Sequence, residues 1–127
     1  MSIRIRSVLP ACIVLTTVCA PAFAADAPAS AGRKVFENRC ASCHVPASPG
    51  ASTLGPSLVG IIGKKAGTQA SGVHSRGVVE SGIVWDRRSL ARFLSEPGRA
   101  APGTVMPVRV ADPKELDALL DYLETLR

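Results

Sequence analysis

Hydrophobic residues recur at helical spacing in the last part of the chain. The leucines of this face, at positions i, i+3, i+4 and i+7, are Leu116, Leu119, Leu120 and Leu123. Asp112 precedes them as an N-cap, Pro113 suits the first helical position, and Glu115 stands where a capping box has its acidic member. The pattern predicts a helix that begins after Asp112 and buries its leucine face.

Two more helices are predicted upstream of this one. Asp86 can cap a helix that runs to about Glu96 and is stopped by Pro97. Its apolar face consists of Leu90, Phe93 and Leu94. A shorter helix is expected over residues 75–81, ending at Gly82.

The first helix is predicted over residues 31–40, with Ser30 as its N-cap. Residues 45–72 are rich in Pro, Gly and Ser and are expected to be irregular, apart from a turn near residues 58–62; residues 100–111 are irregular too. Long loops in a small domain usually wrap around something. Because strand alternation is missing, the sequence predicts an all-α fold of three to five helices joined by long loops.

The N-terminal segment has the pattern of a secretory signal peptide. A basic start at Arg4 and Arg6 precedes a mostly apolar run of about 11 residues and small residues before a cleavage site after Ala24. An uncleaved membrane anchor is the alternative, but a spanning helix needs about 20 apolar residues. We therefore expect a cleaved signal peptide over residues 1–24, a flexible leader over 25–30, and one domain over 31–127 in the periplasm.

Composition narrows the class of protein further. The chain has 127 residues, a net charge of +5, 20% charged and only 4% aromatic residues, with 46% hydrophobic. These values argue against a long coiled coil or a polar disordered chain. Cleavage would remove two of the four cysteines and lower the net charge to +3, too little for a nucleic-acid surface. So small a domain with few large side chains usually depends on disulfides, a metal or a cofactor.

Residues 40–44 form the pattern C-x-x-C-H, which is typical of c-type haem attachment. Cys40 and Cys43, three positions apart at the end of a helix, can each add to one haem vinyl group, and His44 can supply an axial nitrogen. A structural disulfide, a thioredoxin-like pair and a zinc site compete with this interpretation, but a zinc site needs further ligands and a thioredoxin motif a βαβ setting. The signal peptide favours haem, because c-type haem is attached outside the cytoplasm.

Two residues of the cleaved chain could supply the second axial ligand, His74 and Met106. Met106 belongs to a Pro- and Gly-rich loop over residues 102–107. Core packing is the ordinary role of a lone methionine, but such a loop can lie over a flat haem face and present one side chain. The loop favours Met106, and ligation by His74 is the alternative.

Six motifs in order resemble the class I cytochrome c family, of the bacterial type similar to mitochondrial cytochrome c, over about residues 32–126. They are Gly32 with Phe36, Cys40-x-x-Cys43-His44, Gly55-Pro56-Ser57-Leu58 with Gly60, Gly82-Ile83-Val84-Trp85, Pro102-Gly103-Thr104-x-Met106, and Leu119-x-x-Tyr122-Leu123. The resemblance implies the cytochrome c fold around one haem c attached through Cys40 and Cys43. It also implies His44 and Met106 as the iron ligands.

The resemblance implies supporting roles as well. The Pro56 carbonyl should accept a hydrogen bond from the His44 ring, and Trp85 and Thr104 should donate to haem propionates. A dry pocket with a Met ligand should raise the reduction potential. The residues expected to line that pocket are Leu58, Leu90, Phe93, Leu94 and Leu123.

Four positions depart from the family pattern. His74 stands where a propionate-binding Tyr is usual, and Lys64 replaces an Arg near the same group. Phe93 replaces a Tyr that often contacts the Met ligand, and Val78 replaces an Asn. We hypothesise that His74 contacts a propionate and makes the potential pH-dependent; a solvated His74 without effect is the alternative.

The function implied by the resemblance is that of a periplasmic monohaem electron carrier, not an enzyme. Its partners would be other redox proteins, such as a dehydrogenase, a cytochrome complex or a terminal oxidase, and the mature chain would have no membrane span. The alternatives are a haem subunit of an oxidoreductase complex and a ligand-binding or sensor haem protein. With only Arg39 and Arg99 left of the usual lysine ring, docking should be weakly electrostatic. The acidic residues of the last helix are expected to form a cap and a solvated face: Asp112, Glu115, Asp117, Asp121 and Glu124.

Overall fold

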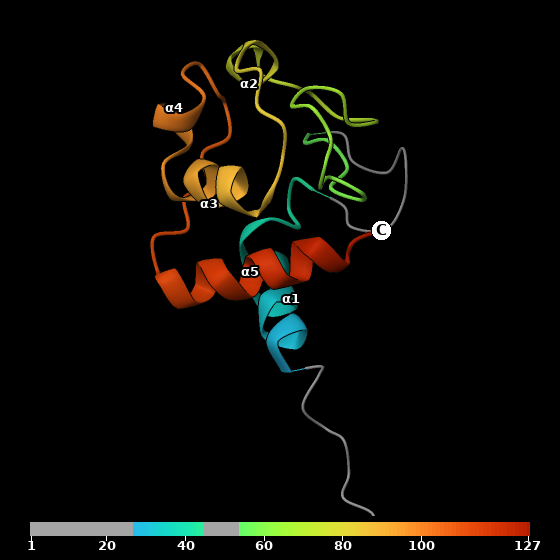
Figure 1. Cartoon of the computed structure of the whole chain (residues 1–127), viewed down its shortest axis with the longest axis vertical. Coiled ribbons are helices and arrows are strands. Elements are labelled where there is room, and N and C mark those ends of the chain that lie inside the picture. The colour runs from blue at the N-terminus through green and yellow to red at the C-terminus, as the bar shows by residue number, and fades with distance from the viewer. Residues whose placement is uncertain (1–26, 45–53) are drawn as a thin grey trace, which may run out of the picture.

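The first and last helices cross and form the base of the domain (Figure 1). Helix α5 (Pro113–Thr125) begins at the predicted N-cap, since Asp112 accepts hydrogen bonds from the backbone N–H groups of Lys114 and Glu115 at 2.8 and 2.9 Å. Helix α1 (Ala27–Arg39) packs on it with Phe36 1% exposed and its ring 5.4 Å from that of Tyr122. Of the predicted leucine face of α5, Leu119, Leu120 and Leu123 are buried, and Leu116 is partly buried against the core.

The computed structural model describes residues 27–44 and 54–127. The expected signal peptide, its cleavage site and the first part of the irregular segment lie outside the described residues. Helix α1 begins at Ala27, so the prediction of Ser30 as an N-cap is wrong, and residues 27–30 of the expected leader are helical.

Helix α3 (Arg87–Ser95) begins at the predicted N-cap, Asp86. The Asp86 carboxylate accepts from the Ser89 N–H at 2.6 Å, and the Ser89 hydroxyl accepts from the Asp86 N–H at 2.8 Å, a reciprocal capping box. Helix α4 (Pro97–Ala100) follows directly and was not predicted. Pro97 stops α3 but also begins α4, because its missing N–H is not needed at a first helical position.

Acidic side chains on α5 are paired rather than simply solvated, which corrects the sequence-based expectation. Glu115 does not complete a capping box with Asp112; it accepts from Arg39 at 2.7 Å and so joins α5 to the end of α1. Arg87 contacts three further carboxylates, and these ion pairs join α3 to α5. The three carboxylates belong to Asp117, Asp121 and Glu124.

The segment between α1 and α3 is mostly loop, as predicted. Helix α2 (Arg76–Glu80) is the short helix expected there, with Ser75 as its N-cap, and Gly82 follows with a φ of +67°. One isolated antiparallel bridge joins Lys65 to Val84. The all-α prediction is confirmed for the described residues, in which no helix has the length and apolar character needed to cross a membrane.

Candidate cofactor site

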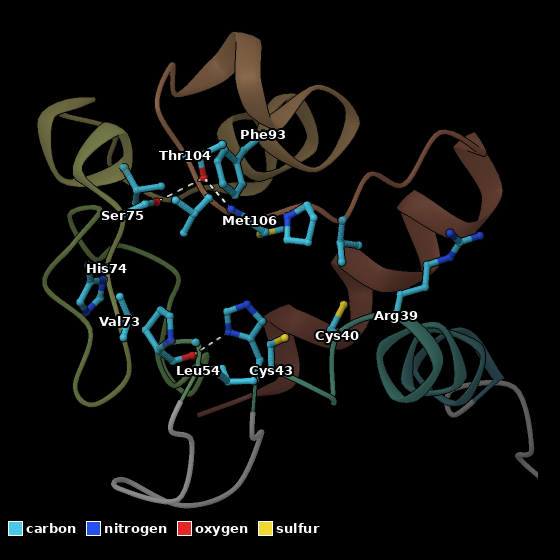
Figure 2. Close-up of a pocket in the computed structure, with 17 residues that line it drawn as sticks. Arg39, Cys40, Cys43, Leu54, Val73, His74, Ser75, Phe93, Thr104 and Met106 are labelled. Atoms are coloured by element: carbon cyan, nitrogen blue, oxygen red, sulfur yellow. Dashed lines mark hydrogen bonds between the residues drawn. The ribbon is translucent and has the colours of Figure 1, made fainter.

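A cavity of about 290 Å³ lies between the end of α1, the loop before α2, helix α3 and the loop of residues 102–108. Its walls are mainly apolar, with Val73, Val78 and Phe93 among the lining side chains. Figure 2 shows Cys40 and Cys43 on one side of the cavity and Met106 across from them. The structure thus brings together at one site two motifs that are far apart in the sequence, residues 40–44 and residues 102–106.

Cys40 and Cys43 reach the cavity because helix α1 ends directly before them, and the turn after it is closed by hydrogen bonds from the Cys43 and His44 N–H groups to the Cys40 carbonyl. Burial raises the pKa of the Cys40 thiol to about 11, so this thiol is protonated at neutral pH. Among the described residues no group of three or more His, Cys, Asp or Glu side chains could hold a metal ion. Cys40, Cys43 and His44 all line the cavity.

His44 is oriented by its neighbours in the way a metal ligand requires. Its Nδ1 lies 2.8 Å from the Pro56 carbonyl oxygen, and since a carbonyl can only accept, Nδ1 donates and the lone pair is on Nε2. Gly55 packs against the ring: a Cβ there would come within 2.6 Å of Cε1. The sequence-predicted contact between His44 and Pro56 is present, and any larger residue at position 55 would displace the imidazole.

Met106 is half-buried and packs partly against the hydrophobic core. The Thr104 hydroxyl accepts from the Met106 N–H at 3.3 Å and lies 3.3 Å from the Ser75 hydroxyl (Figure 2). Thr104 is therefore engaged within the loop, and its predicted bond to a propionate stays a prediction. Val105, which precedes Met106, is exposed and also lines the cavity.

The rings of Phe93 and Trp85 pack against each other in a tilted arrangement, with centroids 5.2 Å apart and an interplanar angle of 60°. Phe93 lines the cavity, whereas Trp85 is 4% exposed and does not. The predicted bond from the Trp85 indole N–H to a haem propionate stays a prediction.

Not all predicted site residues reach the cavity. Leu58 is half-buried against the core, and Lys64 is exposed, with its carbonyl bonded to the Trp85 N–H at 2.9 Å. His74 does line the cavity, and its Nε2 lies 2.9 Å from the Gln69 carbonyl. The roles predicted for these three residues stay predictions.

The chain was compared with known proteins. A family model described as cytochrome c matches residues 29–127. The chain belongs to the cytochrome c family. It is 41% identical over 103 residues to cytochrome c of Tetrahymena pyriformis, covering 80% of this chain and 91% of the relative, and 35% identical over 104 residues to cytochrome c2 iso-2 of Magnetospirillum molischianum, covering 81% and 100%. The structure of cytochrome cH from Methylobacterium extorquens matches with a TM-score of 0.67 and 37% identity, covering 76% of this chain and 97% of that one.

Membership of this family fixes the fold, the cofactor and the general function. The chain has the cytochrome c fold, binds one covalently attached haem c and carries electrons rather than catalysing a reaction. The residues present fit that group: two thiols on one side, an imidazole with its Nε2 lone pair available, and a thioether opposite, within apolar walls. As a cytochrome c, the chain interacts with redox partners.

Several contributors to the site were missed by sequence reasoning. Ser75 and Gly77 contact the Met106 loop, and Leu54, Val73 and Val105 line the cavity. The apolar residues stand in irregular segments without periodicity, so the sequence carries no signal for them. Gly77 could have been suspected only as a glycine inside a predicted helix, where close backbone approach is a common reason.

Proposed function

We propose that the chain is a periplasmic electron carrier whose haem is attached through Cys40 and Cys43 and whose iron is held by His44 and Met106. The observation that carries this proposal is the arrangement of the cavity, with Cys40 and Cys43 facing Met106 across it (Figure 2). When bound, the haem supplies a one-electron couple between Fe(II) and Fe(III). The chain contributes the ligands, their orientation and the exclusion of water.

His44 has its Nε2 lone pair available as a ligand because the Pro56 carbonyl fixes the proton on Nδ1. This hydrogen bond also makes the imidazole a stronger electron donor. Met106 offers a soft, uncharged thioether from the facing loop, and such a ligand favours the reduced metal and a higher potential. Apolar walls disfavour net charge and act in the same direction, so we expect a high potential.

An optical spectrum tests the ligand assignment. The oxidised protein should show the weak absorbance band at the red end of the visible range that reports a Met sulfur on Fe(III). Met106→Ala should abolish this band and lower the potential, while Val84→Ala, at an exposed position that does not line the cavity, should leave both unchanged. A band that survives in Met106→Ala, or its absence from the native protein, would overturn the assignment.

The periplasmic location rests on the N-terminal pattern of a basic start, an apolar run and small residues. Intact mass of the protein recovered from the periplasmic fraction should match residues 25–127 plus one haem. A mass that retains residues 1–24, or holoprotein found only in the cytoplasm, would contradict this part of the proposal.

His74 is proposed to contact a haem propionate and to couple the potential to pH. Its place in the cavity wall supports the proposal; because its Nε2 donates to the Gln69 carbonyl, Nδ1 can donate to a propionate only when the ring is an imidazolium, and this requirement is the source of the coupling. The potential should vary between about pH 5 and 8, the range in which histidines usually titrate, and His74→Ala should remove this variation. The same pH profile in both proteins would refute the coupling.

A further inference from the structure

Helix α2 packs directly on the backbone of the loop that carries Met106. A Cβ added to Gly77 would lie 2.1 Å from the Pro102 oxygen, 2.6 Å from the Gly103 carbonyl carbon and 2.7 Å from the Thr104 nitrogen. All three atoms are backbone, so no side-chain rotation can relieve the overlap. Gly77 is buried at this contact, and only a residue without a side chain fits there.

A hydrogen bond reinforces the same contact. Ser75, the N-cap of α2, places its hydroxyl 3.3 Å from that of Thr104, which in turn accepts from the Met106 N–H (Figure 2). Within the part of the chain that the structure describes, this is the only hydrogen bond that joins residues 102–108 to another segment. The Thr104 N–H also bonds to the carbonyl of Ala101, the residue directly before the loop, and the Met106 N–H bonds to the Thr104 hydroxyl within the loop.

The loop has little else to fix it. Residues 102–108 contain no helix, Val105 is 74% exposed, and Gly103 adopts a φ of +86°. After the loop the chain is anchored at Arg109, whose Nε donates to the Ser95 carbonyl at 2.7 Å, and at Val110, whose N–H bonds to the Leu94 carbonyl at 2.9 Å. The position of Met106 therefore depends on the contacts between the loop and α2.

We infer that Gly77 and Ser75 are positioning residues for Met106: the close packing of α2 keeps the thioether over the cavity and closes the second axial position to outside ligands. This inference rests on the proposed ligation by Met106. Pushing α2 away from the loop should favour a state in which Met106 has left and an added ligand can bind. Gly77 and Ser75 therefore set the free energy needed to reach that state, rather than the free energy of global unfolding.

The test compares the affinity of the oxidised holoprotein for imidazole with its global stability. Gly77→Ala should bind imidazole at least about tenfold more tightly and show a weaker Met band, because overpacking against backbone costs the Met-bound state. Ser75→Ala adds no volume and should fold normally; loss of one hydrogen bond should raise the affinity about fivefold. Gly98→Ala is the matched control, since a Cβ at Gly98 has open space around it, and it should behave like the native protein.

Gly32→Ala provides a second control, because it disturbs the α1–α5 contact and not the loop. It should lower global stability without a comparable gain in imidazole affinity. Native affinity in both folded Gly77→Ala and Ser75→Ala, or an equal gain in Gly32→Ala, would overturn the inference. Failure of the underlying ligand assignment looks different: Met106→Ala would then bind imidazole no better than the native protein.

Discussion

Gly32 at the crossing of α1 and α5 offers a prediction in which two effects have opposite signs. In an isolated helix, replacing glycine by alanine stabilises by about 1 kcal/mol. At position 32, however, the new Cβ would lie 1.9 Å from the Ala118 carbonyl oxygen and 2.7 Å from the Tyr122 Cβ. The first of these is a backbone atom, so the helices must separate to admit the methyl group.

The size of the stability loss follows from the contacts that would weaken when α1 and α5 separate. The Phe36–Tyr122 ring contact contributes about 0.5–1.5 kcal/mol beyond its buried area, and overpacking of a core costs about 1–3 kcal/mol. We take the upper end of the overpacking range, about 3 kcal/mol, and subtract the helix gain of about 1 kcal/mol. Gly32→Ala should therefore lower the free energy of unfolding by about 2 kcal/mol. For a domain of this size that corresponds to a fall in Tm of about 8–16 °C.

Denaturant unfolding of the oxidised holoprotein, followed by far-ultraviolet circular dichroism, measures this change. The midpoint should fall with the slope unchanged, since the same surface is exposed on unfolding. Gly98→Ala in α4 is the same substitution without a clash and should be neutral or slightly stabilising. A Gly32→Ala protein as stable as the native one would show that helix propensity outweighs packing, and the reasoning would be refuted.

Two further predictions concern charged side chains. Arg87→Met removes the positive charge opposite Asp117, Asp121 and Glu124; because the Arg87 side chain is 38% exposed, the loss should be only about 1 kcal/mol, and it should shrink in high salt. A loss unaffected by salt would indicate packing of the arginine stem instead. The backbone N–H of Glu115, followed by that of Lys114, lowers the pKa of Asp112 in the folded protein, so its contribution to stability is complete above the unfolded value of about 3.9 and is lost as the pH falls through the lower, folded value. Asp112→Asn keeps a hydrogen-bond acceptor but cannot titrate. The free energy of unfolding of this variant should therefore fall less steeply below about pH 4 than that of the native protein. Identical pH dependence of the two proteins below about pH 4 would contradict this prediction.

Helices with their own start and stop signals were predictable from the sequence. Asp86 and Asp112 cap α3 and α5 as expected, and Gly82 follows α2. Errors arose where one residue type suits two roles: Ser30 resembles an N-cap but lies within α1, and Pro97 ends one helix while beginning the next. Local propensity cannot distinguish these roles, because the choice depends on how neighbouring segments pack.

The candidate site divides in the same way. Cys40, Cys43 and His44 form a continuous motif, so their proximity is a local property of one turn. Contacts between distant segments gave no such signal: Arg39 pairs with Glu115 across 76 positions, and Arg87 reaches carboxylates 30 or more positions away. Their sequence pattern resembles that of ordinary solvated charges, and only the crossing of the helices pairs them.

The two sides of the cavity are supported by different interfaces, and this separation matters for an electron carrier. The thiols and His44 follow α1, which α5 holds through Gly32 and Phe36, whereas Met106 lies on a loop that α2 holds through Gly77. Disturbing the α1–α5 interface should unfold the domain without weakening one iron ligand more than the other. Disturbing the second should release the thioether while the domain stays folded. Local openings of this kind have their own free energies, lower than that of global unfolding, so the ligand set can be weakened at Gly77 by changes that leave global stability almost unchanged.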